Sequence, residues 1–340
     1  MKYLIVGDVH FRGVNPRARL DNYMEAISRK LHEVFALAQQ HKVDAIIQTG
    51  DLLDSPATGW STAAELAQIL QGSPCPFLTI NGNHDIYAAN PGSKYRTPFG
   101  FLSRLGIIED IGEEAFESGD NGKGIVITGH GFNIETDTPL GKGQFDPATC
   151  FVQLKDGKDV RIHVVHSMLM DHSPGFEMRH TLISQVETSA QVIICGHLHT
   201  GFGSKYVYRR DDGVLFVNPG ALCRLSAHHA EIERKIQVAL LTVEGGKCEA
   251  ELIPLKCAAA GHEVLSREHL EADADRGGRL EKFLSLLASE GESKFLEAVE
   301  IIDDIAAREN LPKEVKAEAL KRIGVAREAL GAESAGAGVA

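Results

Sequence analysis

The chain has few of the features that mark secreted scaffolds and zinc-stabilised domains. Its 340 residues include a single tryptophan, and aromatic residues make up 6% of the total. No two cysteines stand in a CxxC pair, so we expect neither a disulfide framework nor a structural zinc site. We interpret the six cysteines as mostly buried thiols in a reducing compartment; they are Cys75, Cys150, Cys195, Cys223, Cys248 and Cys257.

Long apolar runs are also missing. No stretch approaches the roughly 20 apolar residues that a membrane-spanning helix needs. The N-terminus has an apolar run only at residues 3–6 before it turns polar, which is too short for a signal peptide. We therefore expect a soluble, cytoplasmic protein. The chain also has no internal repeat and no P-loop, since residues 141–145 (GKGQF) form a glycine-rich loop of no more specific type.

Positive charge is scarce. The 35 Lys and Arg residues face 47 Asp and Glu, which leaves a net charge of -12. This balance disfavours broad electrostatic attraction to nucleic acid, which usually requires a basic patch or stripe. Divalent cations bound by some of the acidic side chains would cancel part of the excess negative charge at the binding site. The charge therefore argues only weakly against a nucleic-acid substrate.

Short apolar runs alternate with helical patterns in the first half of the chain, which predicts a layered α/β domain. We expect helices over residues 21–40, 61–71 and 99–105, the first with one apolar face formed by Tyr23, Ile27, Leu31, Val34, Phe35 and Ala38. Later runs follow without long helices between them, so we expect a second, more antiparallel sheet. These runs are residues 124–128, 160–166, 192–195, 214–217, 238–243 and 250–255.

The composition changes near the C-terminus and predicts three regions. Residues 1–258 carry the motifs described below and form the expected catalytic domain. Residues 259–330 are acidic and helical in pattern, with one apolar stripe made by Leu280, Phe283, Leu284 and Leu287. Residues 331–340 are small and glycine-rich, so we expect a disordered tail.

Five short segments with metal-binding side chains each follow an apolar, strand-like run. They are GDVH at 7–10, GDLLD at 50–54, GNHD at 82–85, VVHS at 164–167 and GHLH at 196–199. Loops that leave the carboxyl ends of strands can bring distant positions together. A binuclear hydrolytic site needs two cations roughly 3.5–4 Å apart with hard oxygen and imidazole ligands. The five segments contain such a set.

The spacing suggests how two metals would share these ligands. Asp8 and His10 lie two residues apart, as do His197 and His199, so each pair can point into one crevice. Asp51 is the natural bridging carboxylate. We assign four side chains to the first metal: Asp8, His10, Asp51 and His199. We assign four to the second: Asp51, Asn83, His166 and His197.

In this order the segments resemble the calcineurin-like metallophosphoesterases, over residues 8 to 199. The resemblance implies a two-sheet αββα sandwich with a helical C-terminal extension here, and two divalent metal ions at one edge. Manganese is the expected metal, with iron, zinc or magnesium as alternatives. The resemblance also implies that a metal-bridging hydroxide attacks phosphorus, that His84 acts on the transition state or leaving group, and that Asp85 orients the His84 imidazole.

Other polar residues near the motifs are secondary candidates. Asp54 ends GDLLD and is expected to support a ligand rather than to bind metal. His130, His172 and His180 are either substrate contacts or ordinary loop and core histidines. The clusters KYR at 94–96 and KYVYRR at 205–210 could meet a nucleic-acid backbone, although ordinary strand and loop structure explains them equally well.

Within the family, the chain looks most like the SbcD-type DNA repair nucleases. The features are GNHD, the segment FVNPGALCRLSA at 216–227, where Ala221 departs from the usual Ser, and the helical extension. The resemblance implies DNA as substrate and an SbcC-like ATPase partner at the C-terminal helices. Two alternatives remain: a phosphodiesterase or phosphatase for small phosphoesters, favoured by the acidic surface, and a non-catalytic interaction module. A long basic groove would favour the nuclease, and a closed pocket the second hypothesis.

Overall fold

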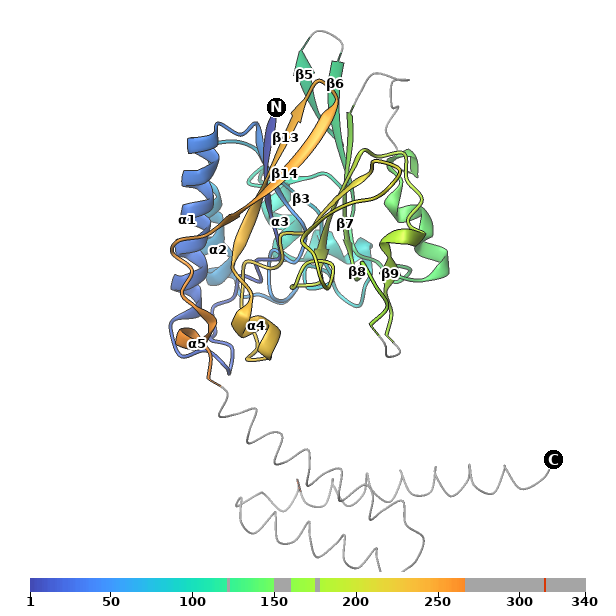
Figure 1. Cartoon of the computed structure of the whole chain (residues 1–340). Coiled ribbons are helices and arrows are strands. Elements are labelled where there is room, and N and C mark those ends of the chain that lie inside the picture. The colour runs from blue at the N-terminus through green and yellow to red at the C-terminus, as the bar shows by residue number, and fades with distance from the viewer. Residues whose placement is uncertain (121–122, 150–159, 175–177, 267–314, 316–340) are drawn as a thin grey trace, which may run out of the picture. The chain divides into compact units, whose positions relative to one another are not determined.

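The computed structural model describes residues 1–120, 123–149, 160–174 and 178–266, together with Val315 (Figure 1). The chain divides into two compact units, Met1–Ser266 and Arg267–Ala340. From residue 267 on, the predicted helical region and the predicted tail belong to the second unit and lie outside the described residues, apart from Val315. The fold below is that of the first unit.

Two six-stranded mixed sheets form the centre of this unit. The first sheet has the order β14-β13-β1-β2-β3-β4, with β1 at Lys2–Val6, β2 at Ala45–Gln48, β3 at Phe77–Thr79, β4 at Glu109–Asp110, β13 at Gln237–Glu244 and β14 at Lys247–Pro254. Strands β1 to β4 are parallel, and β13 and β14 add an antiparallel hairpin beside β1. The segments that follow β1, β2 and β3 therefore leave the sheet at one edge.

The second sheet has a parallel centre. Its order is β11-β12-β10-β7-β6-β5, with β5 at Phe116–Asp120, β6 at Lys123–His130, β7 at Val160–Ser167, β10 at Val192–His197, β11 at Val207–Arg209 and β12 at Leu215–Val217. Only the edge strands β5 and β11 are antiparallel to their neighbours. A short third sheet pairs β8 (Leu169–Met170) with β9 (Thr181–Leu182).

The prediction of a more antiparallel second sheet is therefore wrong. Parallel neighbours need long crossover connections, which are usually helical. Here the described parts of these connections contain short 3-10 helices instead: η2 at Pro139–Phe145, η3 at Pro147–Thr149 and η4 at Ile183–Gln185. The last two predicted strands also join the first sheet and not the second.

The predicted two-sheet sandwich is confirmed by how the strands divide their side chains. In β1, Leu4 and Val6 belong to the core beneath the helices, whereas Tyr3 and Ile5 belong to the core between the sheets. Alternation of this kind places successive side chains on opposite faces. Since the central strands are buried on both faces, their sequences are continuously apolar.

Helices cover the outer face of the first sheet. Helix α1 (Tyr23–His41) begins after Asn22, whose side chain accepts a hydrogen bond from Glu25 N at 3.2 Å, and it ends at Lys42 with φ of 53°. Its predicted apolar face is buried as expected. Helix α2 (Trp60–Leu70) stands beside α1 in Figure 1, and α3 (Pro98–Arg104) contributes Phe99 and Leu102 to the same core.

The outer face of the second sheet is covered differently. Its apolar cluster includes Phe145 from η2, Ile183 from η4, and Phe202 and Phe216. In the described residues this layer consists of 3-10 helices and loops, so the second helical layer of the expected αββα arrangement is reduced.

The end of the unit is tied back to the segment before α1. Helix α5 (Gly261–Val264) packs against α4 (His229–Glu233). Leu20 N donates a hydrogen bond of 3.0 Å to Val264 O, and Ser266 N donates one of 2.9 Å to Ala18 O. The compact unit thus extends through Ser266.

Two compositional expectations also concern this unit. The described cysteines are all free thiols, and three of them are buried: Cys195, Cys223 and Cys248. Cys150 lies outside the described residues. No helix in the described part of the chain has both the length and the apolar character that crossing a membrane requires.

Candidate active site

The five motifs meet at one edge of the sandwich. Asp8, Asp51 and Asn83 follow the parallel strands β1, β2 and β3. From the second sheet, His166 lies in β7 directly beside Gly196 in β10, with His197 next along the strand. The structure therefore brings all seven predicted ligands together: Asp8, His10, Asp51, Asn83, His166, His197 and His199.

The first predicted metal position is surrounded by donor atoms that face one another. Nε2 of His10 lies 3.2 Å from Nε2 of His199. The same His199 nitrogen lies 3.5 Å from Asp8 Oδ2. Nε2 of His10 lies 3.5 Å from Asp51 Oδ2. These are the four side chains assigned to the first metal.

Donor atoms also face one another at the second predicted metal position, which shares one atom with the first. Nε2 of His166 lies 3.2 Å from Asp51 Oδ2, 3.1 Å from Asn83 Oδ1 and 3.2 Å from His197 Nδ1. Asp51 Oδ2 therefore faces His10 on one side and His166 on the other. A carboxylate oxygen in this position suits a bridging ligand between two cations.

The hydrogen bonds and the pKa of His166 indicate whether these residues fit a cation. Its Nδ1 donates a hydrogen bond of 2.8 Å to Thr49 O, so Nε2 turns a lone pair toward the oxygens of Asp51 and Asn83 unless a cation or a second proton lies there. Burial lowers the pKa of His166, but the carboxylates of Asp51 and Asp8 outweigh it and raise the pKa to about 10.

The carboxylates that raise the pKa of His166 would equally favour a cation beside its Nε2. Burial raises the pKa of Asp8, but the hydrogen bond to His199 and the nearby histidines outweigh it and lower the pKa to about 2. Buried carboxylates with imidazole and amide donors suit manganese, iron or zinc. The residues present therefore fit a binuclear centre.

Three of the ligands stand on strained backbone. The φ angles of His10, Asp51 and His197 are 47°, 52° and 81°, a region that residues other than glycine rarely adopt. Residues in such conformations persist only where their surroundings hold them, and they cluster at functional sites. Here His10 N donates to Asp51 O at 2.9 Å, and Tyr23 Oη donates to His10 O at 2.9 Å.

Glycines in the motifs allow the ligands to approach the backbone closely. A Cβ on Gly82 would lie 2.1 Å from Asp51 Oδ1 and 2.3 Å from Asp51 N. A Cβ on Gly196 would lie 2.6 Å from Asp8 Oδ1. All three distances are far below van der Waals contact, so the glycine before Asn83 and the glycine before His197 are part of the site.

His84 lies beside the first donor group. Its ring stands 4.6 Å from the His10 ring, nearly perpendicular to it, and its backbone N donates to Asp51 Oδ1 at 2.7 Å. Nδ1 donates a hydrogen bond of 2.8 Å to the carbonyl oxygen of Asp54. This bond fixes the ring and leaves Nε2 as the nitrogen that can act on a substrate.

Asp85 differs from its predicted role of orienting His84. It is fully buried and accepts hydrogen bonds from Leu52 N at 3.2 Å, Leu53 N at 2.9 Å and Gly82 N at 2.8 Å. The Asp54 carbonyl holds His84 instead. Burial and the charge of Asp51 raise the pKa of Asp85 to about 7. Asp85 therefore braces the loop of Asp51 against the loop of Asn83.

The Asp54 side chain lies against His10. Its Oδ1 is 3.3 Å from His10 Nδ1, without the alignment of a hydrogen bond, and its Oδ2 is 2.9 Å from Arg12 Nη1. The structure therefore places Asp54 as a neighbour of a predicted ligand, as the sequence suggests.

A comparison with protein families decides the identity of the first unit. The model of the calcineurin-like phosphoesterase superfamily domain matches residues 1–246. The chain belongs to the calcineurin-like phosphoesterase superfamily. The matched range includes all five motifs, so the chain carries a metal-dependent phosphoesterase domain.

Two solved structures resemble this phosphoesterase. An archaeal phosphodiesterase is 13% identical, with a TM-score of 0.36, and the match covers 74% of this chain and 100% of that one. A dimetal phosphatase from Danio rerio is 12% identical, with a TM-score of 0.45, and the match covers 75% of this chain and 98% of that one. No curated protein matches the chain. Neither structural likeness is close enough to assign a substrate.

The remaining predicted candidates of the phosphoesterase make local contacts. His130 Nε2 lies 3.0 Å from Asn133 Nδ2, and His180 Nδ1 donates to Met178 O at 2.8 Å. His172 is exposed and pairs with Asp171. Within the described ranges, none of these three histidines has a hydrogen bond, ion pair or ring contact with a predicted ligand.

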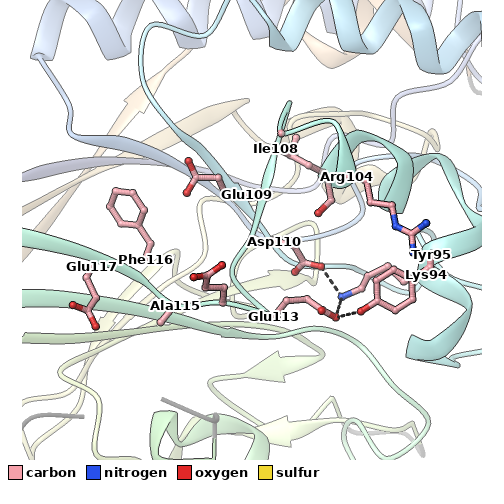
Figure 2. A pocket seen from close by; sticks show the side chains of 14 residues that line it. Lys94, Tyr95, Arg104, Ile108, Glu109, Asp110, Glu113, Ala115, Phe116 and Glu117 are labelled. Atoms are coloured by element: carbon pink, nitrogen blue, oxygen red, sulfur yellow. Dashed lines mark hydrogen bonds and ion pairs between the residues drawn. The ribbon is translucent and has the colours of Figure 1, made fainter. Parts of the chain in front are cut away.

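Lys94, Arg209 and Arg210 of the two basic clusters make structural contacts, whereas Arg96 and Lys205 are exposed. Figure 2 shows Lys94 in an open pocket, where its Nζ lies 2.5 Å from Asp110 Oδ2 and 2.8 Å from Glu113 Oε1. Arg210 pairs with Asp212 at 2.6 Å and donates to two carbonyl oxygens, and Arg209 also donates to carbonyl oxygens. These side chains have protein partners for their charge or their N–H groups.

Several residues near the predicted ligands escaped the sequence analysis. Thr49 orients His166 through a carbonyl oxygen, and Asn218 bonds to Leu198 O at 3.0 Å beneath the GHLH loop. The Phe132 ring lies 5.7 Å from the His197 ring, centroid to centroid, and is tilted by 34° to it. Cys223 has its sulfur within 4.8 Å of donor atoms of His10 and His199. Of these, Asn218 and Cys223 stood in the segment at 216–227 that the sequence analysis had singled out.

Proposed function

We propose that this calcineurin-like phosphoesterase hydrolyses small phosphoesters, either diesters or monoesters, with two bound divalent cations. The observation that supports this most strongly is the pair of donor groups that share Asp51 Oδ2, at 3.5 Å from His10 Nε2 and 3.2 Å from His166 Nε2. The proposed ligands are those of the two groups described above. Manganese is the proposed metal.

Divalent cations bound there would polarise the phosphoester and neutralise its charge. The protein's own residues would do the rest. Because Nδ1 of His84 donates to Asp54 O, its Nε2 faces the substrate, and a ring that carries a second proton there can donate it to the phosphoryl oxygen or to the leaving group. Asp85 holds the loops of Asp51 and Asn83 together, which keeps their side chains in place.

The choice of small substrates rests on charge. The net charge is -12, and Lys94 and Arg210, which could have met a nucleic-acid backbone, are paired with carboxylates. Binding to nucleic acid gains most of its electrostatic free energy from lysines and arginines that neutralise phosphates. Because Lys94 and Arg210 are already paired with carboxylates, they would contribute little electrostatic free energy to nucleic-acid binding.

A DNA exo- or endonuclease of the SbcD type is the second candidate. It is favoured by GNHD at 82–85 and by the segment at 216–227, in which buried Asn218 supports the GHLH loop. On this hypothesis residues 259–330 would dock on an SbcC-like ATPase. A non-catalytic module is disfavoured because His84 and all seven donor residues are present.

One experiment separates the three hypotheses. Purified protein in Mn²⁺ is tested on bis-p-nitrophenyl phosphate, on p-nitrophenyl phosphate, and on labelled single- and double-stranded DNA. The variants are His84→Ala and Asp51→Asn, with exposed His172→Ala as the matched control. The proposal predicts turnover of a small ester, a roughly 10²- to 10⁴-fold loss in His84→Ala, and an unchanged control.

Each other outcome selects a different hypothesis. Cleavage of DNA with little turnover of either small ester would favour the nuclease. Bound metal without activity on any of these substrates would favour the interaction module. Activity that survives Asp51→Asn unchanged would contradict the proposed site itself.

A further inference from the structure

His199 has a different kind of neighbour on each ring nitrogen. Its Nε2 faces the first donor group, at 3.2 Å from His10 Nε2 and 3.5 Å from Asp8 Oδ2. Its Nδ1 lies 3.9 Å from Oε1 of Glu231, a residue of α4, which is beyond hydrogen-bond distance but close enough for the two groups to interact through charge. A carboxylate behind a metal-binding imidazole orients the ring and makes it a more basic ligand.

Arg234 holds the Glu231 carboxylate in place. Arg234 Nε donates to Glu231 Oε1 at 2.9 Å, and Nη2 donates to Oε2 at 2.8 Å. Both side chains are largely buried, at 3% and 9% exposure. A two-point contact of this kind fixes both the position and the plane of the carboxylate.

The segment that contains Glu231 and Arg234 is hydrogen-bonded to the loop after β12. Arg234 Nη1 donates to Ala221 O at 2.5 Å, and Nη2 also donates to Cys223 O. Leu222 N in turn donates to Asp8 O at 2.8 Å. Glu231 is thus connected, through Arg234 and this loop, to the backbone of a predicted ligand.

The second predicted metal position lacks such a carboxylate behind its corresponding ligand. The outward nitrogen of His166, Nδ1, donates to the neutral carbonyl oxygen of Thr49. A carbonyl orients an imidazole but carries no net charge, whereas a carboxylate favours a cation nearby through the part of its charge that the ion pair with Arg234 does not offset. The two halves of the centre are therefore unequal.

We propose that Glu231 is a positioning residue, held by Arg234, that orients His199 and makes the metal position of Asp8, His10 and His199 the tighter of the two. This inference rests on the proposed binuclear centre. It assigns a role at the site to α4, a segment outside the five motifs.

The test is a calorimetric titration of the full chain, freed of metal, with Mn²⁺. Wild type should bind in two steps of different affinity. Glu231→Gln should weaken the tighter step roughly 10- to 100-fold and leave the weaker step unchanged. Glu233→Gln is the matched control, because Glu233 is on the same helix, exposed, and paired with exposed His229 at 3.2 Å. It should leave both steps unchanged.

Phosphoesterase activity provides a second readout that a merely structural role would not give. The activity lost in Glu231→Gln at limiting Mn²⁺ should return in excess Mn²⁺. Melting of the metal-free protein shows whether the variant is folded. If it is not, His199→Gln and His166→Gln are titrated instead: the first should remove the tighter step and the second the weaker one.

Two results would overturn the inference. One is a tighter step that Glu231→Gln leaves unchanged, and the other is loss of the tighter step in His166→Gln. Failure of the binuclear centre itself is distinguishable, because wild type would then take up fewer than two Mn²⁺ ions.

Discussion

His166 Nδ1 donates a hydrogen bond of 2.8 Å to the carbonyl oxygen of Thr49. Thr49 follows β2 in the first sheet, whereas His166 lies in β7 of the second, so the bond joins the two sheets at the edge where the motifs meet. It leaves His166 Nε2 facing Asp51 Oδ2 at 3.2 Å. One sheet thus sets the orientation of a donor that the other sheet supplies.

Asp51 faces both predicted metal positions, so its loss should weaken metal binding more than the loss of a ligand that belongs to one position alone. Asp51→Asn removes the charge that faces both His10 and His166, so we expect binding of both metals to weaken by more than the roughly 10- to 100-fold typical of an outer-shell change. Elemental analysis after dialysis should find about two metals per wild-type chain and almost none in the variant. Retention of both by Asp51→Asn would contradict a bridging role.

Gly82→Ala should abolish metal binding. The added Cβ would lie 2.1 Å from Asp51 Oδ1, so the Asp51 side chain or the GNHD loop must move. Gly59→Ala is a suitable control, because a Cβ there meets nothing within 4 Å. Metal content and activity should fall in the first variant alone. Equal behaviour of the two variants would show that the close approach is unimportant.

Tyr23→Phe should loosen the His10 loop. Tyr23 Oη donates to His10 O at 2.9 Å and to Val9 O at 3.2 Å, and removing the hydroxyl leaves buried carbonyls without this donor. We expect the free energy of unfolding to fall by about 1–3 kcal/mol and Mn²⁺ binding to weaken. Tyr3→Phe, which loses a hydroxyl near Ser118, should change stability but not metal binding. Unaltered Mn²⁺ affinity in Tyr23→Phe would argue against its supporting role.

His163 should make the fold sensitive to acid. It is fully buried between Thr128 Oγ1 and Gln144 O, and burial lowers its pKa to about 4. The unfolded chain, with a histidine pKa of about 6.5, takes up the proton first. Stability is therefore fully present above pH 6.5 and falls as the pH drops toward 4, by about 3 kcal/mol for this group.

Denaturant unfolding of wild type and His163→Gln across this pH range checks the prediction. The variant is expected to be less stable at neutral pH but to lose less stability on acidification, because it lacks the titrating imidazole. Other groups titrate in both proteins, so the difference between the two slopes is the informative quantity. Parallel slopes would contradict the prediction.

Local patterns predicted the helices and most strands well. The α1 stripe from Tyr23 to Ala38 follows from helical periodicity, which acts over a few residues. The direction of the strands in the second sheet was wrong, because parallel pairing of β6, β7 and β10 depends on contacts between distant segments. A run of apolar residues carries no information about the direction of its neighbour.

The predicted ligands were found in the sequence because each ends or follows a strand in a recognisable motif. Their supports were missed because they act through backbone atoms or distant contacts. Asp85 was expected to orient the His84 ring. The ring instead donates a hydrogen bond to the backbone carbonyl oxygen of Asp54, which any residue type at position 54 could supply. Glu231 stands in the charged run EIERK, which is typical of a solvated surface, and only the fold reveals its position behind His199.

The most direct test of the binuclear centre is a crystal structure of the protein grown with Mn²⁺, with data collected at the manganese absorption edge. Two anomalous peaks should appear roughly 3.5–4 Å apart, one beside Asp8, His10 and His199 and the other beside Asn83, His166 and His197, with Asp51 between them. A single peak, no peak, or metal bound away from Asp51 would contradict the account.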